Sequence, residues 1–221
     1  MPENTSIALI TFRNKHLGWK LYRMEIKIKN KIKLKMIMRD IIIDDILKPS
    51  LKRLYQVDYD NIRFGVSERN ICARLAHHME NIMRDYDDSH PIMHFHNYYA
   101  DVEYNRMGNG DLKQYDNSEH RPKYMVSDLL IQSRGYERNY LAVEMKRKGN
   151  NRHANEDRER LASMVSPSPH GMHDRCVHDT LVGAFIVYGI KGVEIELFEN
   201  VNGRGENTET FDISLDNLIV F

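Results

Sequence analysis

Two carboxylates and one lysine stand within an apolar stretch of the chain. Two runs rich in Val, Leu and Ile, 125–131 and 140–145, have the length of buried strands, and the polar connector between them predicts a hairpin. Glu144 and Lys146 share one face of the second strand, and Asp128 can come alongside them from the first. Buried carboxylates cost free energy unless their charge is compensated. A bound divalent cation would compensate it.

A helix upstream of the hairpin is the clearest element of the chain. It is predicted over Ser67–Asp85, with Ser67 as N-cap and Glu68 in the first turn, where a negative charge suits the helix dipole. Its apolar positions recur at helical spacing; they are Ile71, Leu75, Met79 and Ile82. Because Glu68 falls on the same stripe, it either faces inward toward the carboxylates or only serves the dipole.

The remaining patterns predict alternating helices and strands. Residues 40–54 read as a helix that Pro49 breaks or restarts. Further along, the pattern predicts strands at 92–106, 180–190 and 192–199, a helix at 155–164, and loops at 85–91, 107–121 and 165–179. These elements indicate an α/β domain with a mixed central sheet flanked by helices.

Isoleucine and leucine alternate with lysine over Met24–Met38, which predicts a strand or hairpin with one lysine-lined face. One interpretation is an exposed edge strand whose lysines prevent aggregation. The other is a stripe that follows nucleic-acid phosphates.

The composition limits the classes of function. The chain has 221 residues and a formal net charge of +0, so any attraction to nucleic acid must come from a local basic face. Two cysteines argue against a disulfide framework and fit a reducing compartment. No apolar run is long enough to span a membrane, and the N-terminus lacks a signal-peptide pattern. We therefore expect a soluble, cytoplasmic protein.

The order of these elements resembles the PD-(D/E)XK nuclease superfamily, which has the restriction-endonuclease-like fold with an αβββαβ core. The resemblance extends over about residues 58–200 and includes a small, uncharacterised bacterial subgroup. The match to the superfamily rests on Ser67–Asn70, Val126–Gln132 and Ala142–Lys146, and the match to the subgroup rests on Asp101–Arg106 and Asp157–Leu161. Ser127 replaces the proline of the family motif. The implied organisation is an N-terminal extension, 1–57, and a nuclease-like domain, 58–221.

The resemblance implies a role for each matched position. Asp128 and Glu144 would bind Mg²⁺ or Mn²⁺, together with the backbone carbonyl of Met145. Lys146 would orient or activate the attacking water, and Glu68 would lie in the outer shell or contact a second metal. The implied reaction is hydrolysis of a phosphodiester, most often in DNA, and homodimers are common among nucleases of this kind that cut both strands. The same fold can also serve as an inactive module that binds nucleic acid or a protein partner.

A local basic segment follows the second strand of the hairpin. Arg147, Lys148 and Arg152 are the candidate nucleic-acid contacts, and Arg158 and Arg160 continue the run. Ordinary surface charge is the alternative interpretation.

Zinc binding is the rival metal chemistry. A histidine- and cysteine-rich loop offers four ligands within nine residues; they are His170, His173, Cys176 and His178. A second histidine cluster consists of His90, His94 and His96. Neither cluster has the distant second half that most structural zinc modules have. The chain also lacks a P-loop, a G-x-S-x-G elbow and a dinucleotide-binding fingerprint.

Overall fold

The chain divides into two units, Met1–Asp40 and Ile41–Phe221. The computed structural model describes residues 29–30, 32–92, 94–103, 114–116, 122–124, 126–133, 138–167 and 179–219. Residues 41–57, which the sequence assigns to the N-terminal extension, belong to the second unit. The two units are described separately.

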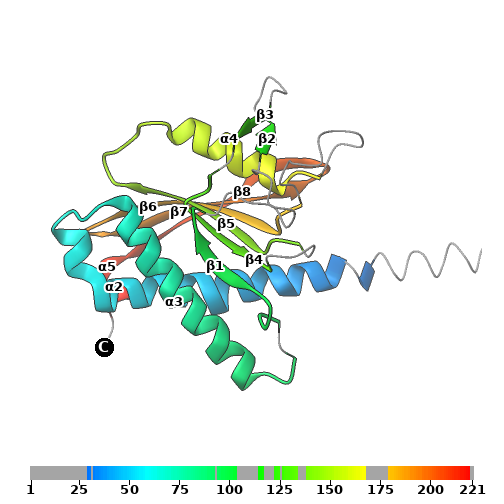
Figure 1. Ribbon diagram of the computed structural model, residues 1–221, viewed down its shortest axis with the longest axis horizontal. Helices are drawn as coiled ribbons and strands as arrows, with labels where there is room; N and C mark the ends of the chain where they lie inside the picture. Colours follow the sequence, from blue (N-terminus) through cyan, green and yellow to red (C-terminus); the bar gives the residue numbers. More distant parts are fainter. Residues whose placement is uncertain are drawn as a thin grey trace, which may run out of the picture. The chain divides into compact units, whose positions relative to one another are not determined.

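A six-stranded mixed sheet forms the centre of the second unit, in the order β1-β4-β5-β6-β7-β8 (Figure 1). Its strands are β1 Tyr99–Val102, β4 Leu129–Gln132, β5 Leu141–Arg147, β6 Val182–Gly189, β7 Gly192–Val201 and β8 Arg204–Ser214. Only the β5–β6 pair is parallel among these described strands, and the other neighbours are antiparallel. A separate two-stranded sheet pairs β2 Gln114–Asp116 with β3 Pro122–Tyr124. The predicted α/β class with a mixed sheet is confirmed.

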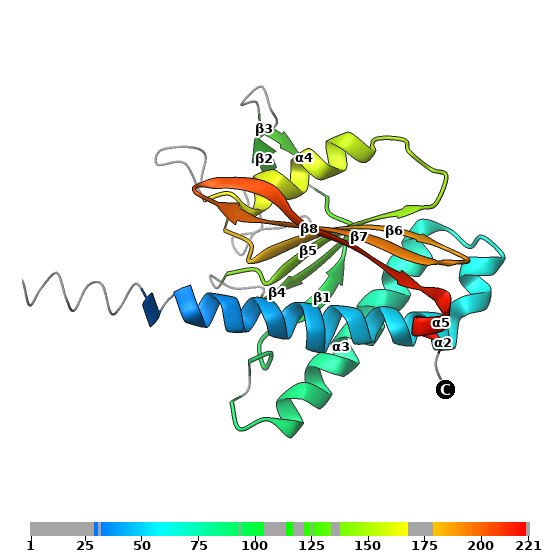
Figure 2. The same ribbon diagram turned by 180° about the vertical axis from the view of Figure 1, so that it is seen from behind.

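Helices cover both faces of this sheet. They are η1 Ile41–Leu47, which is a π-helix, α2 Lys48–Arg63, α3 Glu68–Ser89, α4 Ala154–Val165 and α5 Leu215–Leu218. Helix α4 lies on one face, and α2 and α3 lie on the other (Figures 1 and 2). Beneath α4, Leu161 and Met164 join Ala142 of β5 and Phe185 of β6 in one buried cluster. The predicted helix at 155–164, with Leu161 and Met164 inward, is therefore confirmed.

Helix α3 begins as the sequence predicts but ends later. The Ser67 side chain accepts a hydrogen bond from the Asn70 N–H at 3.3 Å, so Ser67 is the N-cap. The helix continues to Ser89, through residues that were expected to form a loop. Asp87 explains the difference, because its buried carboxylate accepts the backbone N–H of Phe95 at 3.0 Å. This tertiary contact outweighs the weak helix propensity of the local sequence.

The lysine-rich strand predicted over Met24–Met38 is wrong where the structure describes it. Residues 29–30 and 32–40 are helical. Ile32, Leu34 and Met36 are 54–63% exposed whereas Met38 is buried, so the alternating positions do not share one buried face. Lysine, leucine and methionine are good helix formers, and an alternating pattern needs a strand partner to hold it extended.

Pro49 marks the predicted restart of the following helix. It occupies the first turn of α2, and Leu47 before it keeps a right-handed helical backbone, so the chain stays helical through the proline. The preceding turn is the π-helix η1. Ser50 donates its hydroxyl to the Ile46 carbonyl at 2.6 Å, so that carbonyl keeps a partner across the change of helix type.

A buried polar contact joins α2 to α3. Asp58 accepts hydrogen bonds from Arg74 Nε and from His78 Nε2, both at 2.7 Å. Burial alone would raise the pKa of Asp58, but these two partners outweigh it and the pKa is lowered. The ionised carboxylate thus holds together α2 and α3, and Glu68 lies at the start of α3.

None of the described helices combines the length and apolar character that a membrane crossing requires.

Candidate active site

The predicted hairpin forms and brings Asp128 onto strand β5. Antiparallel pairing sets Leu129, the first residue of β4, opposite Val143, so Asp128 lies directly before the paired residues of β4. Its Oδ2 accepts the backbone N–H of Met145 at 2.7 Å. The Asp128 side chain thereby accepts the N–H that a backbone carbonyl would accept if β4 were longer. This hydrogen bond fixes the carboxylate beside β5.

Glu144 points from β5 toward α4. It lies on the same strand face as Ala142, which packs in the core beneath α4. Glu144 is only 1% exposed, and its Oε1 is 2.9 Å from Arg160 Nε of α4. These two buried atoms lie within ion-pair distance but are not aligned for a hydrogen bond. Glu144 is therefore a desolvated carboxylate held by charge more than by hydrogen bonding.

Lys146 occupies the next position on that face, as the strand alternation predicts. Its Nζ is 3.0 Å from Asp157 Oδ2, and its side chain is 15% exposed. Asp157 also receives a hydrogen bond from Arg160, three residues later on α4. The charges thus alternate in sign from Glu144 through Arg160 and Asp157 to Lys146, and one turn of α4 holds both Glu144 and Lys146.

Asp157 is a site residue to which the sequence pattern gave no role, although Asp157–Leu161 is one of the segments that carry the family resemblance. The sequence carried a signal, because an i, i+3 pair of opposite charge directly precedes the buried Leu161. Arg160 was instead expected among the surface charges that could contact nucleic acid. That expectation is wrong, since its guanidinium turns inward to Glu144 and Asp157.

Glu68 reaches the end of β5 but does not contact the other two carboxylates. Its Oε1 accepts the backbone N–H of Arg147 at 3.0 Å and the side-chain amide of Asn150 at 2.8 Å. It remains close enough for its charge to act on the pKa of Lys146. Glu68 therefore joins the start of α3 to the end of β5, beside the site.

Burial dominates the electrostatics of the site. It raises the pKa of Asp128, against the Met145 hydrogen bond, and it raises the pKa of Glu144 well above the ordinary range, against the charge of Arg160. The Asp128 carboxylate also contributes to the raised pKa of Glu144, so the two acidic groups repel each other. Burial alone would lower the pKa of Lys146, but Asp157 reverses this and raises it. The lysine is therefore an ammonium ion, and the paired carboxylates favour a further cation.

The donor atoms suit a hard divalent cation with few protein ligands. Mg²⁺ prefers oxygen and usually keeps several waters, so one or two carboxylates suffice. Asp128 and Glu144 supply two, and Glu144 Oε1 is a buried oxygen without a hydrogen bond. Within the described ranges, no three or more His, Cys, Asp or Glu side chains are grouped so as to hold a metal ion. A cation here would depend on these two carboxylates and on backbone or water oxygens.

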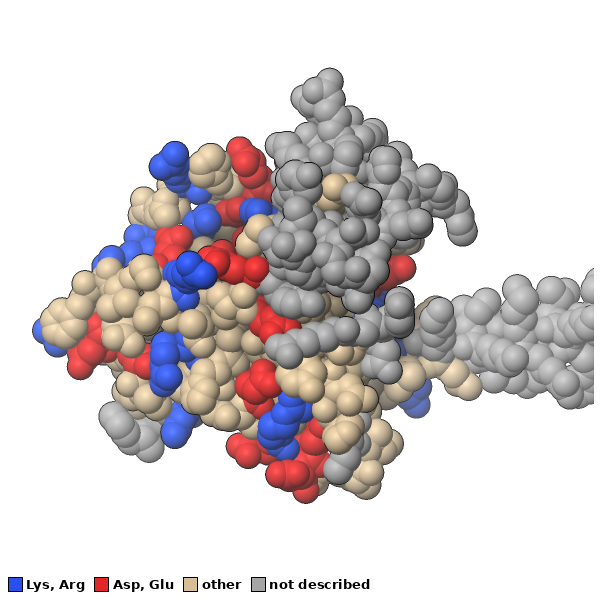
Figure 3. Space-filling model, in the orientation of Figure 1, with Lys and Arg blue, Asp and Glu red and all other residues tan. Residues whose placement is uncertain are grey.

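The predicted nucleic-acid contacts differ in how free their charges are. Arg147, Lys148 and Arg152 are exposed. Lys148 pairs with Glu194, and Arg152 donates to His153 Nε2 at 3.1 Å. In the view of Figure 3, blue and red side chains are interspersed over the coloured part of the surface. Arg158, expected to extend the basic run, is instead paired with Glu196.

The zinc interpretation has no support among the described residues. His170, His173, Cys176 and His178 lie outside them. His90, His94 and His96 form no metal-binding group; His90 stacks on Tyr86 instead, with ring centroids 3.9 Å apart.

Comparison with known proteins adds no functional assignment. No protein-family model, curated protein or solved structure matches this chain.

Proposed function

We propose that this protein is a metal-dependent nuclease that hydrolyses phosphodiester bonds. The observation that carries the proposal is the convergence of Asp128, Glu144 and Lys146 at one end of the β4–β5 hairpin. The order α3, β1, β4, β5, α4, β6 also agrees with the αβββαβ core of the restriction-endonuclease-like fold, when the separate β2–β3 pair is set aside. DNA as the preferred substrate rests on the resemblance to that superfamily.

Asp128 and Glu144 would hold Mg²⁺ or Mn²⁺, with the Met145 carbonyl as a further donor. When bound, such an ion polarises the phosphoryl oxygen and favours a hydroxide nucleophile. Asp157 keeps Lys146 protonated. The lysine therefore acts as a hydrogen-bond donor that orients the attacking water and offsets phosphate charge, and it does not act as a base. Arg160 favours the ionised form of Glu144, which is the form that binds a cation.

A second candidate is a nuclease-like module without catalysis that binds nucleic acid or a protein partner. The ion-paired chain through α4 favours this alternative, because Lys146 and Glu144 already have partners of opposite charge. A structural role for the same cluster would need no metal. Metal binding therefore separates the two candidates.

Mn²⁺ titration followed by electron paramagnetic resonance tests the proposal. The wild type should bind Mn²⁺ in competition with Mg²⁺, and Asp128→Asn should weaken binding by at least about tenfold, because an amide oxygen is a poorer ligand than a carboxylate. The amide can still accept the Met145 N–H, so the hairpin should remain folded. Circular dichroism checks the fold of each variant.

Asp212→Asn is the matched control, because Asp212 is an exposed carboxylate on β8. Its Mn²⁺ affinity should equal that of the wild type. Equal affinity of Asp128→Asn and wild type would exclude Asp128 as a ligand and would favour the non-catalytic module.

A further inference from the structure

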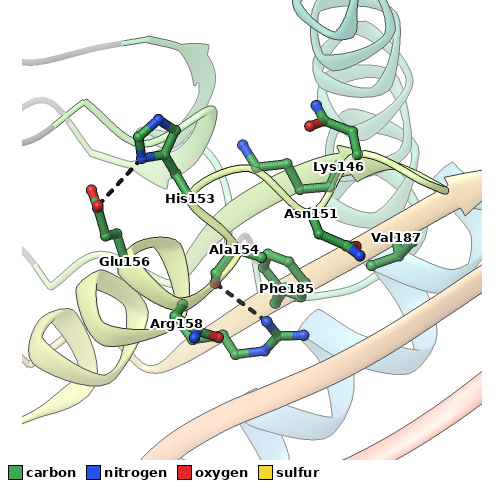
Figure 4. Close-up of a pocket in the computed structure, with 10 residues that line it drawn as sticks. Lys146, Asn151, His153, Ala154, Glu156, Arg158, Phe185 and Val187 are labelled. Carbon is green, nitrogen blue, oxygen red and sulfur yellow. Dashed lines mark hydrogen bonds and ion pairs between the residues drawn. The ribbon is translucent and has the colours of Figure 1, made fainter.

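A groove lies beside Lys146, between the end of β5 and the start of α4. Its volume is about 390 Å³, and apolar Phe185 and Val187 from β6 line it together with polar residues of the β5–α4 segment (Figure 4). His153 leads into α4 with a left-handed backbone, at φ 60°, and its Nδ1 is 3.3 Å from Glu156. The groove therefore combines an apolar side with polar groups next to the candidate site.

Arg158 gives the groove a fixed, flat surface. Its guanidinium lies over the Phe185 ring, 4.1 Å from the ring centroid. Nε and Nη2 both donate to the carboxylate of Glu196, at 2.8 and 2.6 Å, and Nη1 donates to the Ala154 carbonyl at 3.3 Å. With its charge paired and its plane held, Arg158 is suited to stacking on a planar ring and poorly suited to clamping a phosphate. Arginine planes and aromatic rings are the surfaces on which proteins stack bases.

The amide side chains of Asn151 and Asn155 also line the groove. In the part of the chain that the structure describes, neither Asn151 nor Asn155 has a side-chain hydrogen bond. Asn150 differs, because its amide donates to Glu68 and its oxygen accepts the Arg152 N–H. Amide groups carry both donors and acceptors, and they match the edges of nucleobases.

We propose that this groove is the subsite for the nucleoside adjoining the phosphate at Lys146. The base stacks on Arg158, and Asn151 and Asn155 hydrogen-bond to its edge. The inference deepens the proposed function and rests on it for the position of that phosphate. Binding in the groove then depends on contacts with the base, because its lysine and arginine, Lys146 and Arg158, are already paired with Asp157 and Glu196.

Binding of 2′-deoxynucleoside 5′-monophosphates, measured by NMR without divalent metal, tests the subsite. Deoxyribose 5-phosphate and inorganic phosphate are the base-free probes. At least one of the four nucleotides should bind at least about tenfold more tightly than either probe, because stacking alone contributes about 1–3 kcal/mol per base. The Arg158 Nε–H resonance should shift only with the nucleotides.

Asn151→Ala and Asn155→Ala should each weaken nucleotide binding severalfold. The matched control is Asn217→Ala, an exposed asparagine on α5 that should leave the affinity unchanged. Equal binding of the base-free probes, or unchanged affinity in both groove variants, would overturn the subsite. Because this measurement needs neither metal nor cleavage, its failure is separate from a failure of the proposed nuclease activity.

Discussion

Lys146→Ala is expected to lower kcat for nucleic-acid cleavage by about 10²- to 10³-fold, the range found when one preorganised hydrogen-bond donor is removed from an active site. Lys146 is the only ammonium ion among the described residues of the candidate site, and the ion pair with Asp157 holds it at 3.0 Å. Without it, the attacking water loses its orienting donor. Substrate binding should change less, since Arg147 and Arg152 remain exposed nearby.

Two controls separate a chemical role of Lys146 from loss of fold. Lys191→Ala removes an exposed lysine at the β6–β7 turn and should cleave as the wild type does. Lys146→Ala should also still bind Mn²⁺, because both proposed carboxylate ligands are retained. Cleavage by Lys146→Ala at the wild-type rate would remove the catalytic role from this residue.

Arg160→Met is expected to lower the free energy of unfolding by about 3–5 kcal/mol, the usual cost of removing one partner from a buried ion pair. The variant leaves Glu144 without its nearest positive charge, in a position that is 1% exposed. Urea denaturation in EDTA measures the loss. Arg204→Met, at an exposed position of β8, should change stability by no more than about 0.5 kcal/mol.

The size of this loss should depend on pH. Burial already raises the pKa of Glu144, and Arg160 opposes that rise, so the variant raises it further. A raised pKa in the folded state contributes stability that is complete below the unfolded value of about 4.3 and is lost as pH rises through the folded pKa. The difference between variant and wild type should therefore shrink in acid and grow toward neutral pH. A difference that stays constant with pH would mean that Glu144 is not the group that Arg160 supports.

Metal offers a second measurement on the Arg160→Met variant. If Glu144 binds a divalent cation, the ion supplies the positive charge that the missing guanidinium supplied. Saturating Mn²⁺ should then restore part of the lost stability, by mass action on the folded state. Glu144→Gln combined with Arg160→Met should be more stable than Arg160→Met in EDTA, because the uncompensated charge is gone.

The elements that carry the site could be predicted because their local patterns agree with their tertiary surroundings. The Ser67 cap, the apolar runs around the hairpin and the helical spacing of Leu161 and Met164 each identify an element by periodicity or hydrogen-bond chemistry. Strand alternation alone then puts Glu144 and Lys146 on one face.

The partners of those side chains could not be predicted, because they come from packing between distant elements. The i, i+3 spacing of Asp157 and Arg160 indicates that they can pair with each other but not that both lie over β5, and charged helix residues are usually exposed. The strand prediction for the lysine-rich segment was wrong for a related reason. Its alternating pattern resembles a strand, but residues 32–40 form a helix, because a strand exists only where a neighbour pairs with it.

Cleavage by the purified protein tests the central claim most directly. Plasmid DNA, single-stranded DNA and RNA are each incubated with Mg²⁺, with Mn²⁺ and with EDTA, using wild type and Lys146→Ala side by side. The account predicts that the wild type cleaves at least one substrate with a divalent metal, that EDTA stops cleavage, and that Lys146→Ala is nearly inactive. No cleavage of any substrate by the wild type, or equal cleavage by both proteins, would contradict it.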